Sequence, residues 1–358
     1  MTKKKVAILF GGRSVEHGVS INSARNIFEY IDKDRFEPVP IGISTQGVWY
    51  LTTGVSKDIE KGEPLSLTLD GAKPHWKAGD KSISVDIAFP VLHGTDGEDG
   101  SIQGLLKAMS VPMVGTGVLG SAVSMNKLTS KRLLQKADIP VAPFLDFSYQ
   151  EQDRLSFEDI SKQMGLPFMV KATSLGSSVG ITKVKSKEDF RPALEEAFRY
   201  DNHILIEKYI KGREIECAVL GNDPPTASLP GEIVISDRYD FYTFDAKYVD
   251  NTAVNIEVPA KLDPEKQDEI RRLSVKAFEA LHCEDFARVD LFLAGDGNIY
   301  INEINTIPGF TNSSMYPMMW KERGLSFTEL ITKLIDIAFQ RVEKSRRVET
   351  NFKSSLKF

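Results

Sequence analysis

The sequence has few cysteines and no long apolar run, and these absences exclude several classes of protein. Only Cys217 and Cys283 occur among 358 residues, too few for a disulfide framework, so we expect two buried thiols in a reducing compartment. No run approaches the roughly 18 apolar residues of a membrane span. The basic residues 1–5 lead into a strand-like run and show no cleavable export signal. We therefore expect a cytoplasmic protein with no membrane partner.

An excess of basic residues is also missing. Lys and Arg number 45 against 50 Asp and Glu, and they are scattered, so the chain has no extended positive field for nucleic acid. Hydrophobic residues make up 41% of the chain, which is enough for a substantial core. The length exceeds the roughly 250 to 300 residues at which a single core stops growing. We expect a soluble protein of two or three subdomains that binds no nucleic acid.

Apolar periodicity predicts an α/β beginning and an α+β remainder. Residues 5–10 and 36–43 are expected to be strands on either side of a helix near 21–31, which together make a βαβ unit. The other expected strands are 85–92, 144–147, 168–171, 180–184, 204–206 and 215–220, and the other expected helices are 120–137, 187–200, 264–280 and 325–345. The predicted subdomains are 1–116, 117–206 and 207–345, followed by a frayed tail at 346–358.

The stretch 288–305 is the most informative part of the sequence. It contains two apolar runs around Asp296-Gly297, and Asp-Gly is a strong signal for a two-residue hairpin turn. A turn at these two residues would set the register of both strands, and a one-residue error in the turn would change every cross-strand pair.

That hairpin would gather polar side chains on one face. With the turn at Asp-Gly, Asp290 opposes Glu303 and Arg288 opposes Asn305, all on the same side. Opposed carboxylates repel unless a cation lies between them, and carboxylate and amide oxygens suit Mg²⁺ or Mn²⁺. The alternative is a solvated strand face with an ion pair to Arg288.

Two further segments have the composition of a nucleotide site. Lys171 ends a strand and enters a Ser/Gly loop, where backbone amides and the lysine can meet a phosphate. The alternative is an ordinary surface loop, because the spacing is not that of a Walker loop. Glu207 and Glu214 follow another apolar strand, where they can meet an adenine and a ribose, or simply be solvated charges at a strand end.

Two strand ends near the start of the chain point to a crevice for a small substrate. Residues 11–20 link the first strand to the first helix, where open α/β sheets place ligands. Glu16 in this link can accept hydrogen bonds from an ammonium group, and a plain strand-helix turn is the alternative. His93, at another strand end, reaches the same crevice, or serves only to cap or pack.

Taken together and in this order, these segments resemble the D-alanine–D-alanine ligase family of the ATP-grasp superfamily, from residue 6 to about 338. The motifs that carry the resemblance are 10–20 (FGGRSVEHGVS), 92–104 (LHGTDGEDGSIQG), 175–180 (LGSSVG), 212–216 (GREIE) and 301–311 (INEINTIPGFT). The resemblance implies a three-subdomain ATP-grasp architecture, with a lid at 236–253, and a homodimer.

The resemblance also implies a role for individual residues. ATP would be held by Lys127, Lys171, Ser178, Glu207, Lys208, Ile210, Glu214 and Lys247. Two Mg²⁺ or Mn²⁺ ions would be bound by Asp290, Glu303 and Asn305. The residues that would act on D-alanine are Glu16, Ser177, Tyr248, Arg288 and Gly309 as catalytic groups, and His93, Ser314 and Met315 as substrate contacts.

The implied reaction activates one D-alanine with ATP and joins it to a second. The first carboxylate attacks the γ-phosphate, magnesium and lysines offset the charge, and an acyl phosphate results. The second amine attacks that carbonyl, with Arg288 and the Gly309 amide at the oxyanion. A closed lid would keep water away from the acyl phosphate. The dipeptide would serve peptidoglycan synthesis.

Some alternatives stay open at this point. Tyr248 favours D-alanine as second substrate, although related ligases use D-lactate or D-serine. A non-catalytic ATP-binding module is the other alternative, whereas a nicotinamide-dependent oxidoreductase lacks its glycine fingerprint. The chain has Asn126 where the family commonly has Asp, Ala172 where it has Pro, and Gly18 where it has an acidic residue.

Overall fold

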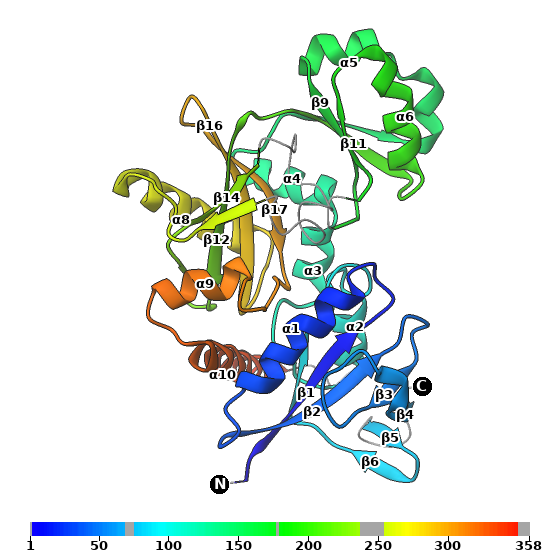
Figure 1. The fold of residues 1–358 in the computed structure, drawn as a ribbon, viewed down its shortest axis with the longest axis vertical. Coiled ribbons are helices and arrows are strands. Elements are labelled where there is room, and N and C mark those ends of the chain that lie inside the picture. The colour runs from blue at the N-terminus through cyan, green and yellow to red at the C-terminus, as the bar shows by residue number, and fades with distance from the viewer. Residues whose placement is uncertain (1, 69–74, 177–178, 237–253, 350–358) are drawn as a thin grey trace, which may run out of the picture.

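The computed structural model describes residues 2–68, 75–176, 179–236 and 254–349. Ser177, Ser178, Lys247 and Tyr248, which have predicted roles, lie outside the described residues, as do nearly all of the predicted lid and the tail from residue 350. The described residues form three sheets with helices packed on them (Figure 1). The predicted α/β beginning and α+β remainder are confirmed.

The first sheet has its parallel strands at one end and its antiparallel strands at the other. Its order is β6-β5-β4-β3-β2-β1-β7, and β1 pairs parallel with both β2 and β7. The elements of this part are β1 (Lys4–Gly11), α1 (His17–Tyr30), β2 (Phe36–Ile43), β3 (Trp49–Leu51), η1 (Ile59–Lys61), β4 (Glu63–Thr68), β5 (His75–Ala78), β6 (Lys81–Ile83), β7 (Ile87–Pro90) and α2 (Ser101–Ala108). The βαβ unit is confirmed.

Strand β1 is apolar from Val6 to Phe10 because both of its faces are covered there. Val6, Ile8 and Phe10 join a core with α1, and the intervening Ala7 and Leu9 join a second core with α2. All five side chains are fully buried. The carboxyl ends of β1 and β7 therefore lie side by side, and each leads into one of the two segments predicted to bind the small substrate.

The central part is a four-stranded antiparallel sheet of order β10-β9-β11-β8, with α5 and α6 packed against it (Figure 1). Its elements, with the two helices that precede it, are α3 (Val118–Met125), α4 (Lys127–Lys136), β8 (Phe144–Ser148), η2 (Tyr149–Arg154), α5 (Phe157–Met164), β9 (Phe168–Ala172), β10 (Ile181–Val184), α6 (Lys187–Phe198) and β11 (His203–Lys208).

The prediction of a single helix at 120–137 is wrong, because two helices, α3 and α4, lie there. Asn126 separates them with an extended backbone, and its side chain accepts from the Thr129 amide at 2.9 Å, which caps α4.

The last sheet is antiparallel, with the path β15-β14-β12-β16-β17 and with β13 paired to β12. Its elements and the helices around it are β12 (Gly212–Leu220), β13 (Thr226–Ala227), β14 (Gly231–Ile235), β15 (Val254–Glu257), α8 (Pro264–Ala280), β16 (Phe286–Ala294), β17 (Ile299–Asn305), α9 (Met315–Glu322) and α10 (Phe327–Ser345). Helix α10 leaves this sheet and lies beside α1, so a helix near the end of the described chain packs on the first part (Figure 1).

The β16–β17 hairpin reaches the predicted register by an unpredicted route. The turn has three residues, 295–297, because the Ala294 amide donates to the Asn298 carbonyl at 2.9 Å. Gly297 takes the left-handed backbone, with φ +85°, that such a turn requires. The register then shifts between Asp290 and Leu291 at a β-bulge. The bulge offsets the longer turn, so the predicted pairs, Asp290 with Glu303 and Arg288 with Asn305, are confirmed.

One hydrophobic core joins the first and last parts of the chain. Phe89 of β7 packs against Phe286 at 6.2 Å and Phe310 at 6.4 Å between ring centroids. Leu334 and Ile335 of α10 belong to the same core, together with α1 and β1. The central sheet has a separate core, made by residues between 155 and 206.

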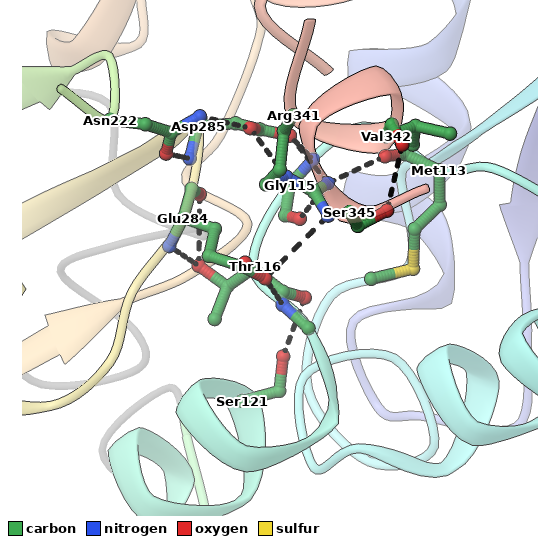
Figure 2. Close-up of polar contacts among 11 residues, drawn as sticks. Met113, Gly115, Thr116, Ser121, Asn222, Glu284, Asp285, Arg341, Val342 and Ser345 are labelled. Atoms are coloured by element: carbon green, nitrogen blue, oxygen red, sulfur yellow. Dashed lines mark hydrogen bonds and ion pairs between the residues drawn. The ribbon is translucent and has the colours of Figure 1, made fainter. Parts of the chain in front are cut away.

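A buried ionic cluster fixes the strand-to-helix link at 113–117 to the last part of the chain (Figure 2). Asp285 is fully buried. It accepts two hydrogen bonds from Arg341 of α10 at 2.8 Å, one from the Gly115 amide at 2.8 Å and one from Asn222 at 2.9 Å. Arg341 also donates to the Met113 carbonyl at 2.8 Å. Three distant segments therefore meet at one carboxylate.

No helix in the described ranges is long and apolar enough to cross a membrane.

Candidate active site

A cleft of about 350 Å³ lies between the central sheet and the last sheet. One wall comes from β9, β10 and β11, and the other from β12, β14, β16 and β17. The residues predicted to hold ATP or metal that line it are Lys127, Lys171, Glu207, Lys208, Ile210, Glu214, Asp290 and Glu303. Sequence segments separated by more than a hundred residues thus converge on one cavity with charged walls.

At the back of the cleft, one carboxylate is shared by two lysines. Glu207 of β11 is 2% exposed, and it contacts Lys171 at 2.7 Å and Lys131 at 3.3 Å. Burial would raise the pKa of Glu207, but attraction to Lys131 and Lys171 outweighs it and leaves that pKa lowered. Sequence reasoning missed Lys131. Its position one helical turn after Lys127 on α4 could have indicated that both side chains share a face.

The hairpin face holds its acidic groups in ion pairs. Arg288 donates to both oxygens of Asp290 at 2.7 Å and lies 2.9 Å from Glu216. Asn305 donates to Asp290 at 2.8 Å, and Lys127 lies 3.3 Å from Glu303. The ion pair to Arg288, which was the alternative to a metal site, is therefore present.

The donor chemistry at this face fits a hard divalent cation that also has phosphate ligands. Asp290, Glu303 and Asn305 belong to two alternate pairs of the ladder, on the same face, and offer two carboxylates and an amide. Within the described residues, no group of three or more His, Cys, Asp or Glu side chains is arranged to hold a metal ion. A cation here would need the oxygens of a bound phosphate to complete its coordination. The β-bulge also turns Asn302 into the cleft, where it accepts from Lys171 at 3.3 Å.

A second group of predicted residues lies where β1 and β7 end. Glu16 is 8% exposed. A Cβ placed on Gly94 would lie 2.6 Å from its Oε2 atom, and one placed on Gly176 would lie 3.3 Å away. The carboxylate of Glu16 thus lies against glycines of two other predicted motifs.

His93 is buried, and both of its ring nitrogens are used within the protein. Nδ1 lies 2.8 Å from the Ile307 carbonyl, and Nε2 lies 3.0 Å from the Ser23 hydroxyl, which also accepts from the Phe310 amide. Burial holds the pKa of His93 below its usual value. The side chain links the first helix to the loop 307–310, which carries Gly309, and this arrangement corresponds to the packing alternative for this histidine.

Glu98 strengthens the same link and was missed by sequence reasoning. Its two carboxylate oxygens accept from the Gly94 amide at 2.8 Å and the Ile307 amide at 2.9 Å. Burial and the nearby charge of Glu16 raise the pKa of Glu98 to about 8.

The remaining predicted contacts lie at the start of α9. A Cβ on Gly309 would lie 2.9 Å from the hydroxyl oxygen of Ser314, so this hydroxyl lies against the loop. The same hydroxyl oxygen accepts from the Thr311 amide at 3.0 Å. Met315 is 4% exposed, and its side chain belongs to the core shared with α10.

Comparison with known proteins matches nearly the whole chain. The family model described as "D-ala D-ala ligase N-terminus" matches residues 5–116, and that described as "D-ala D-ala ligase C-terminus" matches residues 133–336. The chain is 45% identical to the D-alanine–D-alanine ligase of Shouchella clausii, over 98% of this chain and 99% of that protein. It is 43% identical to D-alanine–D-alanine ligase A of Escherichia coli K12, over 98% and 100%.

Solved structures give the same result. The D-alanine–D-alanine ligase of Coxiella burnetii superposes with a TM-score of 0.85 at 37% identity, over 97% of both chains. The VanG D-Ala:D-Ser ligase of Enterococcus faecalis superposes with a TM-score of 0.84 at 36% identity, over 94% of this chain and 100% of that chain.

Proposed function

This chain belongs to the D-alanine–D-alanine ligase family, which has the ATP-grasp fold, and we propose that its cleft joins two D-alanines through a D-alanyl phosphate. The reaction is the ATP-dependent ligation that supplies D-alanyl-D-alanine for cell wall synthesis. The observation that carries this conclusion is the match to the family over almost the entire length. The convergence of the predicted ATP residues on one cleft supports it.

In the first step, a carboxylate oxygen of one D-alanine attacks the γ-phosphorus of ATP, and ADP leaves. Lys127 and Lys171 line the cleft, and we assign them to the phosphates because phosphoryl transfer depends on cations near the moving charge. Glu207, Lys208 and Ile210 are assigned to adenine and Glu214 to the ribose. Two Mg²⁺ ions, held by Asp290, Glu303 and Asn305, would add Lewis-acid stabilisation of the phosphate charge.

In the second step, the amine of the other D-alanine attacks the acyl carbon, phosphate leaves and the amine loses a proton. Glu16 is assigned to the ammonium of the first D-alanine, and Arg288 with the Gly309 amide to the oxyanion. Ser314 is assigned to the carboxylate of the second. His93 is then a neighbour of the substrate that holds the 307–310 loop in place, since its two nitrogens already have partners.

The experiment is phosphate release from ATP and Mg²⁺ with products identified by mass. We expect release to depend on D-alanine, to be absent with L-alanine, and to yield the dipeptide. D-alanine with D-serine, or with D-lactate, tests the alternative second substrates, to which the similarity to the VanG D-Ala:D-Ser ligase gives weight. ATP binding without D-alanine-dependent release would contradict the proposed ligation.

A matched pair of variants on one hairpin tests the metal assignment. Glu303→Gln removes a proposed ligand and should abolish turnover at any Mg²⁺ concentration. Asp296→Asn makes the same chemical change at the exposed tip of the hairpin, outside the cleft, and should leave turnover unchanged. If Glu303→Gln turns over as fast as Asp296→Asn, the assignment of Glu303 as a metal ligand is wrong.

Three further assignments complete the proposal. The parts 1–116, 117–206 and 207–345 would act as a substrate domain and two ATP-gripping subdomains. The family resemblance favours a homodimer, which light scattering on the eluted protein would test. Use of ATP favours a cytoplasmic location, which fractionation of the host cell would test.

A further inference from the structure

Lys131 is a buried lysine beside the cleft whose role the reaction does not explain. Its side chain is 1% exposed. Its ammonium lies 3.3 Å from Oε1 of Glu207, yet in the described part of the chain neither of these two atoms has a hydrogen-bond partner. Burying a lysine is costly unless its charge is compensated. An apolar residue at this position would avoid the cost but would not place a positive charge beside Glu207.

The two lysines on Glu207 are not equivalent. Lys171 lines the cleft and lies 2.7 Å from Oε2 of Glu207, whereas Lys131 lies behind the cleft wall. A phosphate entering the cleft competes with Glu207 for the ammonium of Lys171. If Lys171 turns toward the phosphate, Glu207 loses its closer partner while still buried, which is unfavourable unless another cation is present.

We propose that Lys131 is a positioning residue that holds the charge of Glu207, so that Lys171 is released to the phosphates of ATP. The inference rests on the proposed role of Lys171 in binding ATP. In the free protein, the carboxylate is shared between the two lysines, and the group carries one net positive charge. With nucleotide bound, Lys131 and Glu207 remain as a neutral pair, and Lys171 faces the phosphate.

The environment of Lys131 supports this role. Burial lowers the pKa of Lys131, and attraction to Glu207 opposes the change. Its helix, α4, begins beside the Ser/Gly loop, because Asn126 donates to the Ser174 hydroxyl at 3.0 Å and Lys127 donates to the Leu175 carbonyl at 2.6 Å. Lys131 is therefore fixed to the same scaffold as the loop that follows Lys171.

The test compares nucleotide binding in Lys131→Met, Lys131→Arg and the control Lys136→Met. Methionine fills a similar volume and leaves Glu207 and Lys171 as a neutral pair, so the variant should fold with an unchanged melting temperature. We expect its Kd for Mg²⁺ and a non-hydrolysable ATP analogue, measured by calorimetry without D-alanine, to rise on the order of 10- to 100-fold. Lys131→Arg keeps the charge and should bind more tightly than Lys131→Met. Lys136 is exposed on the same helix, and its variant should bind like the wild type.

A second substitution separates positioning from simple structural support. The Glu207→Gln variant lacks the carboxylate that retains Lys171, so adding Lys131→Met to it should change the Kd by less than about twofold, whatever Glu207→Gln itself costs at the adenine. In all of these variants the KM for D-alanine should stay within about twofold of the wild-type value, whereas the KM for ATP should rise in Lys131→Met. Unchanged affinity in Lys131→Met, or the same loss when Lys131→Met is made in the Glu207→Gln background, would overturn the proposal. Failure of the wild type to bind the analogue would instead overturn the proposed function.

Discussion

Replacing Asp285 by Asn should destabilise the whole junction between the first and last parts of the chain. The new amide would place donors against Arg341 and the Gly115 amide, both of which donate to Asp285 at 2.8 Å. Asn tolerates the left-handed backbone found at this position, φ +62°, so the loss would come from contacts and not from the backbone. Breaking a buried ion pair by changing one partner costs about 3 to 5 kcal/mol.

The loss would be measured as the free energy of unfolding in urea. The control is the ion pair between Lys344 and Asp223, at 2.6 Å, which joins the same helix to the loop that carries Asn222 but has both partners more than half exposed. Lys344→Met should change the free energy by less than about 1 kcal/mol. If Asp285→Asn costs no more than Lys344→Met, the junction does not stabilise the fold as argued.

A double-mutant cycle tests the pair directly. Arg341→Met alone leaves Asp285 buried and charged, with Asn222 and the Gly115 amide as its remaining donors. Asp285→Asn with Arg341→Met leaves no buried charge at the pair. The double variant should therefore lose less than the two single losses added together, by on the order of 1 to 3 kcal/mol.

Three further outcomes are expected. Gly94→Ala should raise the KM for D-alanine at least about tenfold with little change in nucleotide affinity, because the new methyl would lie 2.6 Å from Glu16, and the backbone there has φ +73°; an unchanged KM would argue against Glu16 as a substrate contact. Cys217 and Cys283, whose pKa values burial raises to about 11 and about 12, should resist iodoacetamide at pH 7.5 until the protein is unfolded, and rapid labelling of the folded protein would refute this. Glu98 has a folded pKa of about 8 against 4.5 for its ordinary value, so its proton stabilises the fold below pH 4.5 and that contribution is lost as the pH rises to 8; the melting temperature of the wild type minus that of Glu98→Gln should fall across this range, and a rise would contradict the assignment.

Local signals predicted most strands and helices because apolar period and capping residues act over a few positions. They failed at Asn126, where one side chain ends a helix that the apolar pattern alone would continue. The hairpin at 288–305 shows a different limit. The register of its strands near Asp290 was predicted correctly from a two-residue turn, but the turn has three residues. The predicted pairing holds only because the bulge beside Asp290 offsets the extra residue.

The candidate site was predictable where a residue belongs to a motif and not where its role depends on distant packing. The cleft positions of Lys171 and Glu207 follow from strand ends. The sequence near Lys131 carries no sign that Glu207, 76 residues later, will share its carboxylate with this lysine. The engagement of both nitrogens of His93 likewise depends on Ser23 and Ile307, which come from separate parts of the chain.

The core around Phe89, Phe286 and Phe310 determines which parts of the protein unfold together. Because this core combines the first and last segments, neither can unfold without exposing the aromatic surface of the other, and the two should exchange their slowest amide hydrogens together. The central sheet has its own core, which includes Phe168 and Phe190, so it should unfold locally without the other two parts. A fragment that ends at residue 116 would therefore be prone to aggregate when expressed alone, whereas the piece from about 138 to 208 carries a complete core and should fold by itself.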